Sequence, residues 1–309
     1  MNNPVSAIDI CLCTYRRPQV AQTLETLAHQ VLPEGITARV IVADNDETPS
    51  AKELVEQTAA RLGLNLTYIH APARNISVAR NACLDAATAP LIAFLDDDEK
   101  APSNWLAALY TQIEESKADV VLGPVRANYS PEAPDWMKRG DFHATKPVWV
   151  NGEITTGYSC NVIFRRESSA LKSLRFRPDL GKSGGEDTFF FDAVHKSGGK
   201  ITYAPEALLE EDVTPARATL SWLARRRFRS GQTHGLLLLE AAQGLYPKRL
   251  RHIIIASAKA LFSLCAAPLH IARKEHFVFW LLRATMHAGV VSRLLGKREL
   301  EQYGKETPT

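Results

Sequence analysis

The sequence predicts an α/β fold with a mostly parallel central sheet flanked by helices. Five short apolar runs alternate with segments whose apolar residues recur at helical spacing, which is typical of a parallel, right-handed sheet. The length of 309 residues, with 45% hydrophobic and 23% charged residues, allows one large or two ordinary domains with a sizeable core. No internal repeat interrupts this pattern.

The first three apolar runs are predicted strands, each followed by a predicted helix. Residues 7–13 alternate apolar and other side chains, and Pro18 suits the first position of the next helix. The apolar residues of that helix recur at helical spacing: Val20, Leu24, Leu27 and Val31. The next two pairs are a strand at 38–43 with a helix at 49–62, and a strand at 66–70 with a helix at 76–87.

The fourth run, residues 91–95, ends in a cluster of carboxylates. It leads into Asp96, Asp97, Asp98 and Glu99. A short apolar run is typical of a strand buried on both faces, and such strands end at a crevice that binds ligands. Acids grouped at that place repel one another, so they are most stable when a divalent cation neutralises them. The alternative is a solvated acidic turn. A helix at 105–113 and a strand at 119–125 follow.

The segment 126–156 has no clear period and is expected to be irregular. It contains Trp136 and Trp149, which either pack on sugar rings or cover the sheet edge. Beyond it we expect a strand at 161–164, a sharp acidic turn at 184–187, a helix starting at Phe189 and a last strand at 201–209.

The carboxyl-terminal part is predicted to be helical and basic. From residue 215 onward the chain has 16 Lys and Arg against 5 acids, whereas the rest has a net charge of −8. Such a segment can meet a nucleic acid, an anionic lipid surface or a phosphate-bearing substrate. Residues 252–272 are long enough to cross a bilayer, but Lys259, Pro268 and the many small residues make them weaker than a typical spanning helix. Together with the apolar helix at 277–295 they favour a helical segment that lies on an anionic membrane surface. The other alternative is a hairpin in the protein's own core or a dimer interface.

The cysteines and the amino terminus indicate a cytoplasmic protein. Five cysteines, odd in number and mostly inside apolar runs, are typical of reduced core residues. Cys11 and Cys13 have no second metal-type pair, which argues against a zinc site. Residues 1–10 show neither a charged leader nor an apolar signal core.

The strand-end loops of such a sheet converge on one crevice, where their side chains suit a nucleotide diphosphate. A carboxylate at Asp44 can accept the imide N–H of a pyrimidine, Asp96 can bind ribose hydroxyls, and Asp98 can hold a metal on the diphosphate. Arg80 can neutralise part of that diphosphate as it leaves. Asp187, after two glycines, is the candidate general base.

The segments ICLCTYRRP, VIVADND, SVARNACLDAATAPLIAFLDDDE, SCNVIFRR and GGEDTFFF together resemble glycosyltransferase family 2. The resemblance covers about residues 8–231 and implies the GT-A fold, inversion at the sugar carbon, a UDP-sugar donor and Mg2+ or Mn2+. It implies nucleotide-sugar binding by Thr14, Tyr15, Arg16, Asp44, Arg80, Asp96 and Asp97. It also implies metal binding by Asp98, catalysis by Asp187, and acceptor contacts by Trp136, Trp149 and Glu186.

Within the family the chain is similar to enzymes that build succinoglycan, an exopolysaccharide. This implies transfer of one glucose, β-1,4-linked, from UDP-glucose to an undecaprenyl-diphosphate-linked oligosaccharide at the cytoplasmic face of the bacterial inner membrane, with no nucleic-acid partner. Residues 226–229 resemble the Gln-x-x-Arg-Trp signature of processive members only loosely, which favours a single addition. The implied division is a nucleotide-sugar half at 1–125, an acceptor half at 126–231 and a basic helical tail at 232–309.

Four alternatives stay open at this point. The first is a member of the same family with another UDP-sugar donor and a lipopolysaccharide or other surface-glycan acceptor. An aspartate-nucleophile phosphatase is disfavoured because its acidic pair follows the first strand, and a nucleotidyltransferase because residues 14–17 are not a glycine-rich loop. A non-catalytic, membrane-tethered scaffold that binds a nucleotide sugar is the fourth.

Overall fold

The computed structural model describes residues 6–300 and divides into two compact units. Within that range, the first unit comprises residues 6–126 and 144–211, and the second comprises 127–143 and 212–300. This division reflects packing, so the three-part functional division at 125 and 231 stays a prediction. Residues 1–5 of the segment 1–10, in which no leader was expected, and residues 301–309 of the expected tail lie outside the described range.

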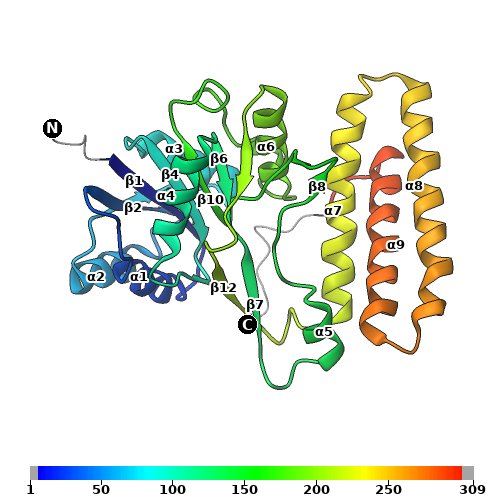
Figure 1. Ribbon diagram of the computed structural model, residues 1–309, viewed down its shortest axis with the longest axis horizontal. Coiled ribbons are helices and arrows are strands. Elements are labelled where there is room, and N and C mark those ends of the chain that lie inside the picture. The colour runs from blue at the N-terminus through cyan, green and yellow to red at the C-terminus, as the bar shows by residue number, and fades with distance from the viewer. Residues whose placement is uncertain (1–5, 301–309) are drawn as a thin grey trace. The chain divides into compact units, whose positions relative to one another are not determined.

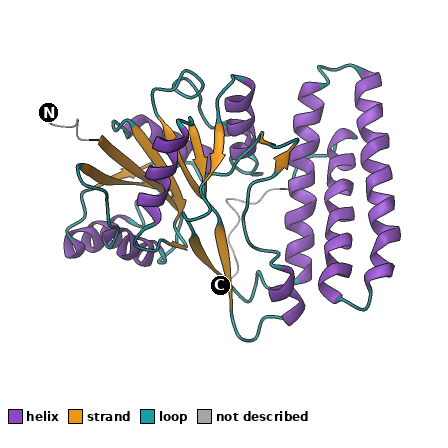
Figure 2. Ribbon diagram, viewed as in Figure 1, coloured by secondary structure: helices purple, strands orange, loops and turns teal. Residues whose placement is uncertain are grey.

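The first unit contains the alternating strands and helices (Figures 1 and 2). Its elements are β1 (Ser6–Thr14), α1 (Val20–Ala28), β2 (Ile36–Asp44), α2 (Lys52–Leu62), β3 (Leu66–His70), α3 (Ile76–Ala86), β4 (Leu91–Asp96), β5 (Glu99–Lys100), α4 (Trp105–Ser116), β6 (Val120–Leu122), β8 (Trp149–Val150), β9 (Glu153–Ile154), β10 (Asn161–Arg165), η1 (Pro178–Leu180), α6 (Glu186–Lys196) and β11 (Ile201–Tyr203). Two strands, β7 (Val125–Tyr129) and β12 (Leu209–Val213), include the boundaries between the units.

The described strands form a mostly parallel central sheet, as expected. Its order is β11-β6-β10-β4-β1-β2-β3, and β10 is the antiparallel member, paired with β4 and β6. A second sheet has the order β5-β12-β7. Because β10 runs against its neighbours, its first residue lies at the edge where the parallel strands end.

Helices cover both faces of the central sheet, which explains why its strands are apolar runs. On one face Ile8, Ile10 and Leu12 of β1 pack with α1, α2 and α4. On the other face β2 and β4 pack with α3 and α6. The result is a three-layer unit whose core lies on both sides of β1 and β4 (Figure 1).

Two predicted strands are each divided by a proline. The strand expected at 119–125 ends at Leu122, because Gly123-Pro124 turns the chain and the Asn161 amide donates to the Pro124 carbonyl at 2.8 Å. A Cβ at Gly123 would lie 2.5 Å from the Ala207 carbonyl oxygen. The strand expected at 201–209 likewise becomes β11 and β12, separated by a turn around Pro205.

Two helix boundaries also differ from expectation. Helix α1 ends at Ala28, so Val31 lies beyond it with 66% of its surface exposed, and its N–H donates to the Ser103 carbonyl. The acidic turn expected at 184–187 is a glycine turn followed at once by helix: Glu186 is already the first residue of α6. The segment 126–156 is less irregular than expected, since it contains β7, α5 (Asp135–Gly140), β8 and β9.

The second unit is mainly helical, as expected. Its long helices are α7 (Leu220–Ala241), α8 (Tyr246–Ala266) and α9 (Lys274–Leu294), with a short η2 (Ala267–His270) after α8. Helices α8 and η2 together, Tyr246–His270, are long and apolar enough to cross a membrane, and an 18-residue window within them has a mean hydropathy of 1.6. Length and composition alone do not distinguish such a helix from one that lies on a membrane.

Candidate active site

The carboxyl edge of the central sheet brings together acids from distant parts of the sequence. In the strand register Thr14 lies opposite Asp44, and Cys13 lies opposite Asp96. The antiparallel β10 starts at the same edge with Asn161, whose side chain is fully buried. The fold therefore places the predicted residues of β1, β2 and β4 in one row.

Asp44 is completely buried and organises the loop after β2. Its Oδ1 accepts the Asp46 N–H at 3.0 Å, and its Oδ2 accepts the Ala51 N–H and the Tyr68 hydroxyl, each at 2.8 Å. Burial and the Asp44 carboxylate raise the pKa of Tyr68, which keeps that hydroxyl a donor. Since each carboxylate oxygen has two lone-pair directions, Oδ1 retains capacity for one further donor.

The loop after β1 places an aromatic ring and a cation beside this edge. Arg16, with a positive φ of 53°, donates from Nε to Asp46 Oδ2 at 2.9 Å. Its guanidinium carbon lies 5.4 Å from the Tyr15 ring centroid. The Tyr15 hydroxyl is buried and has no hydrogen-bond partner among the described residues. A buried polar atom of this kind at a strand edge is suited to bind a polar ligand.

Arg17 connects two carboxylates of the acidic cluster. Its Nη1 donates to Asp97 Oδ1 at 2.9 Å and to Asp98 Oδ2 at 2.7 Å. Burial lowers the pKa of Arg17, but the attraction of Asp97 and Asp98 outweighs it and raises that pKa. Burial raises the pKa of Asp97 to about 7 although Arg17 opposes the change.

Asp96, Glu99 and Cys160 form the group in the described range that best matches a metal-ligand set. One oxygen of each carboxylate and the Cys160 sulfur lie within 4.8 Å of one another. The Asp96 N–H donates to Glu99 Oε2 at 2.8 Å, which fixes the turn. Burial and the nearby Asp96 charge raise the pKa of Glu99 well above its usual range, so extra positive charge would stabilise this group.

Helix α3 carries Arg80 into the same edge. The helix starts at Asn75, whose side chain accepts the Ser77 and Val78 N–H groups. Arg80 is buried, pairs through Nη1 with Glu186 and has Nη2 3.8 Å from Asp96 Oδ1. This arginine therefore joins α3 both to the acidic cluster and to the start of α6.

The start of α6 places Asp187 near these acids. Gly184 and Gly185 adopt φ values of 85° and 95°, which favour glycine, and the helix begins directly after them. Asp187 Oδ1 accepts the N–H of Thr188 at 2.7 Å. Repulsion from Asp187 contributes to raising the pKa values of Asp96 and Glu186, after burial, which is the larger cause in both. Asp187 thus belongs to the same electrostatic environment as Asp96.

The three residues expected to contact an acceptor have different surroundings. Trp149, on β8, is 56% exposed. Trp136 is 9% exposed and packs in the second unit with Phe142, Leu223 and Leu282, so little of its ring is available for a sugar. Glu186 is buried in its pair with Arg80.

Sequence reasoning overlooked Arg17 and Cys160 as site residues, and it gave Glu99 no role beyond membership of the acidic cluster. Arg17 is the second arginine of TYRRP, and its position directly before a helix was the available signal.

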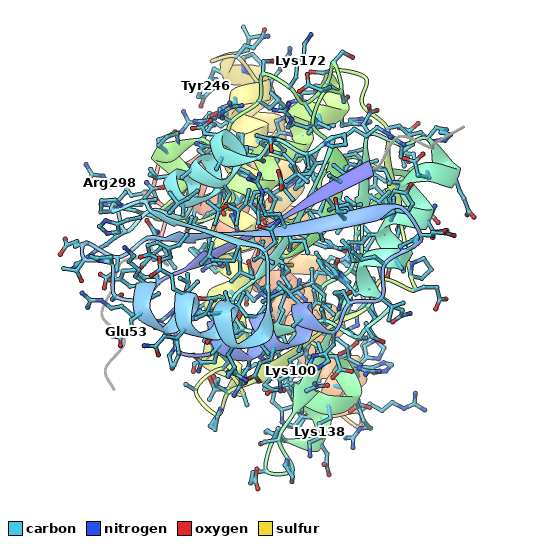
Figure 3. The ribbon with its side chains drawn as sticks, turned by 90° about the vertical axis from the view of Figure 1, so that its left-hand side faces the viewer. Glu53, Lys100, Lys138, Lys172, Tyr246 and Arg298 are labelled. Atoms are coloured by element: carbon cyan, nitrogen blue, oxygen red, sulfur yellow. The ribbon has the colours of Figure 1, made fainter. Side chains whose placement is uncertain are left out.

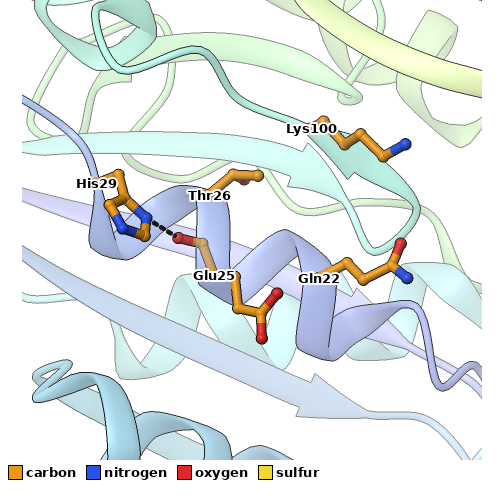
Figure 4. Close-up of a pocket in the computed structure, with 5 residues that line it drawn as sticks. All are labelled: Gln22, Glu25, Thr26, His29 and Lys100. Atoms are coloured by element: carbon orange, nitrogen blue, oxygen red, sulfur yellow. Dashed lines mark hydrogen bonds between the residues drawn. The ribbon is translucent and has the colours of Figure 1, made fainter.

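A separate surface hollow, formed by α1 and β5, contains none of the predicted residues (Figure 4). It is lined by Gln22, Glu25, Thr26, His29 and Lys100.

Comparisons with known proteins agree on the family and the fold. A family model described as glycosyl transferase family 2 matches residues 9–170. The succinoglycan biosynthesis protein ExoM of Rhizobium meliloti (strain 1021) is 51% identical over 312 residues, which cover 100% of this chain and 99% of that protein. The solved mannosyltransferase PcManGT from Pyrobaculum calidifontis, in complex with GDP-Man and Mn2+, superimposes with a TM-score of 0.63 at 20% identity, over 94% of this chain and 88% of that chain. S. aureus TarS 1-349 in complex with UDP superimposes with a TM-score of 0.52 at 18% identity, over 94% and 92% of the two chains.

Proposed function

The chain belongs to glycosyltransferase family 2, and from this we propose that it transfers a single hexose with inversion to a lipid-linked oligosaccharide of succinoglycan biosynthesis. The proposed donor is UDP-glucose and the proposed linkage β-1,4. The observation that carries the proposal is the 51% identity to ExoM over the whole length of both chains. The row of carboxylates and arginines at one sheet edge supplies groups suited to this chemistry.

The proposed donor site lies at the ends of β1, β2 and β4. Asp44 Oδ1, which has capacity for a further donor, accepts the uracil N3–H, and the Tyr15 ring packs beside the base. Asp96, whose side chain is 45% exposed, accepts the ribose hydroxyls. The neighbours with UDP or GDP-Man bound support a nucleotide sugar as donor.

The proposed cofactor is Mg2+ or Mn2+, bound by Asp98 together with the donor diphosphate. The side chains present suit a hard cation, because the edge gathers Asp96, Asp98 and Glu99 in one cluster. A bound divalent ion would supply positive charge to the departing diphosphate. Among the described side chains, Arg17 already holds Asp98, so it orients that carboxylate.

Arg80 has two proposed roles at this edge. Its Nη1 fixes the start of α6 through Glu186, and its Nη2 points toward Asp96, on the side assigned to the ribose and diphosphate. A guanidinium at that place stabilises the charge that develops on the leaving group. Arg16 and Asp97 complete the proposed nucleotide-sugar set by holding the two strand-end loops in place.

Asp187 is the proposed general base. It takes the proton from an acceptor hydroxyl while that oxygen bonds to the anomeric carbon of glucose and the bond from that carbon to the diphosphate breaks, releasing UDP. Attack opposite the leaving group converts the α-linked donor into a β-linked product. Trp149, with its exposed ring, is the proposed acceptor platform.

A transfer assay with separate donors tests the proposal. Radiolabelled UDP-glucose, UDP-galactose and UDP-glucuronate are each incubated with the protein and a lipid-linked trisaccharide acceptor. We expect a lengthened product from UDP-glucose. A β-glucosidase should then release the labelled glucose from that product. Incorporation from another donor instead would reject glucose and keep the family, whereas UDP-sugar binding without any transfer would favour the scaffold.

The proposed place of action is the cytoplasmic face of the bacterial inner membrane. An acceptor carried on undecaprenyl diphosphate lies at the membrane surface, among anionic lipids. The apolar helix pair of α8 and η2 supports membrane association of the second unit.

A further inference from the structure

Helix α8 is the outer member of the helical layer in the second unit. Helix α9 packs between α7 and α8 (Figure 1). The α7–α9 contact is close because glycines meet backbone: a Cβ at Gly231 would lie 1.9 Å from the Met286 carbonyl oxygen, and one at Gly289 would lie 2.0 Å from that of Phe228. Helix α8 therefore has one covered side, against α9, and one side that α7 and α9 leave open.

The two sides of α8 differ in how much they expose. The covered side has Ile253, Ala256 and Ser263 at helical spacing, and Ala256 packs with Val290 and Leu294 of α9. The open side, with the turn after it, exposes between 39% and 83% of each of its large apolar side chains: Leu250, Ile254, Ile255, Leu261, Leu264, Leu269 and Ile271. Phe262, at its border, is 64% exposed and contacts Trp280 of α9 with its ring. Tyr246, at the start of α8 and labelled in Figure 3, is 70% exposed. A continuous apolar face of this kind marks an interaction surface.

The segment that carries this face has only basic charges. The 34 residues from 241 to 274 contain no Asp or Glu. They contain Lys248, Arg249, Arg251, Lys259, Arg273 and Lys274, at both ends of the apolar face and on its flank. Two copies packed through this face would bring like charges together, whereas an anionic lipid surface would complement them.

We propose that the open side of α8 and η2 docks on an anionic lipid bilayer, with α8 lying in the plane of the surface. This rests on the proposed place of action and deepens it, by naming the face that docks and its orientation, and it holds whichever sugar is transferred. A spanning α8 would draw its partner α9 into the hydrocarbon, and with it the exposed Arg283 at the middle of that helix. An in-plane helix buries its apolar side chains and leaves its basic flank among the headgroups.

Vesicle flotation tests the docking face. The full chain is floated with vesicles of phosphatidylcholine alone and with vesicles that also contain phosphatidylglycerol, next to the double variant Ile254→Glu/Leu261→Glu. We expect the wild type to float with the anionic vesicles and the double variant to lose about tenfold or more in partitioning, because two buried apolar side chains become charged. Val31→Glu is the matched control, since Val31 is 66% exposed on the other unit.

Three results would overturn docking through this face. One is a double variant with an unchanged thermal midpoint that floats as well as the wild type. Another is a control variant whose partitioning onto the anionic vesicles falls as much as that of the double variant. The third is a wild type that is dimeric by light scattering without vesicles and becomes monomeric in the double variant, since the face would then bind a second copy.

The depth of two labelled positions in the bilayer distinguishes an α8 that lies on the membrane surface from one that spans the membrane. Cys265 is the exposed cysteine of the described residues, and Ala258 lies seven residues before it on the same side of α8. An environment-sensitive fluorophore is attached either to Cys265 or to Ala258→Cys in a Cys265→Ser background. We expect equal, shallow depths on anionic vesicles, whereas a depth difference of about 10 Å would show a spanning helix.

Transfer to a soluble acceptor analogue separates this proposal from the proposed function. If docking is wrong, flotation fails while transfer continues. If the proposed reaction is wrong, transfer fails while the protein still floats.

Discussion

Arg80 of α3 and Glu186, the first residue of α6, form an ion pair in which both side chains are buried. The pair connects the helix before the acidic strand to the helix that carries Asp187, although 106 positions separate its members. Arg80 also faces Asp96. The pair therefore fixes the spacing between the proposed donor carboxylates and the proposed base.

Breaking this pair is expected to destabilise the first unit strongly. Glu186→Leu leaves the Arg80 cation buried without its main partner, and we expect the free energy of unfolding in urea to fall by about 3–5 kcal/mol. The double variant Arg80→Met/Glu186→Leu should recover much of that loss. Asp85→Ala, which breaks an exposed pair with Arg175, is the control and should cost less than about 1 kcal/mol. A loss in Glu186→Leu as small as in the control would contradict the buried pair.

Asp97 is expected to make stability depend on pH. Burial raises its folded pKa to about 7, from an ordinary value of 3.8. Its contribution to stability is therefore complete below about pH 4 and is lost as the pH rises toward 7, because the folded state then has to hold a buried charge. Without divalent ions, the stability of Asp97→Asn relative to the wild type should increase between pH 5 and pH 8. If the free energy of unfolding changed equally with pH in the two proteins across that range, this assignment would be refuted.

Gly181 is expected to tolerate no side chain, because it lies against the cap of α3. A Cβ there would lie 1.7 Å from Asn75 Oδ1, the atom that caps the helix carrying Arg80. We expect Gly181→Ala to cost about 1–3 kcal/mol in chemical unfolding. Since Asn75→Ala removes the clashing atom, the double variant should be more stable than the sum of the single effects predicts, by more than about 0.5 kcal/mol. Strict additivity would show that the two residues act independently.

The strands and their acidic ends were predictable because burial on both faces leaves a plain sequence signature. Asp44 and Asp96 end apolar runs, so the sheet alone brings them to one edge. The expected α/β class, GT-A fold and family are confirmed. The antiparallel direction of β10 was not predictable, because an apolar run does not encode strand direction.

Side-chain pairings in loops left no such signature. The bridge from Arg17 to Asp97 and Asp98 depends on how a loop turns. The burial of Trp136 depends on helices some 85 to 150 positions later in the chain, a separation over which sequence periodicity carries no information. The start of α6 at Glu186 required the geometry of two glycines.

The metal role of Asp98 is testable without measuring transfer. Binding of Mn2+ in the presence of UDP can be followed from the electron paramagnetic resonance signal of the free ion. We expect Asp98→Asn to weaken this binding by at least about tenfold, since a carboxylate ligand is lost. Cys160→Ser should change it little, because Mn2+ prefers oxygen ligands. The reverse order of effects would move the metal to the Asp96, Glu99 and Cys160 group.

The most direct test of the central claim compares transfer and UDP binding in Asp187→Asn. We expect the rate of transfer from UDP-glucose to fall by about 10²- to 10⁴-fold, because the acceptor hydroxyl loses its base, while the Kd for UDP stays within about threefold of the wild type. Asp192→Asn, on the same helix and paired with Lys196, is the control and should retain transfer. Transfer at the wild-type rate in Asp187→Asn would contradict the proposed catalytic site.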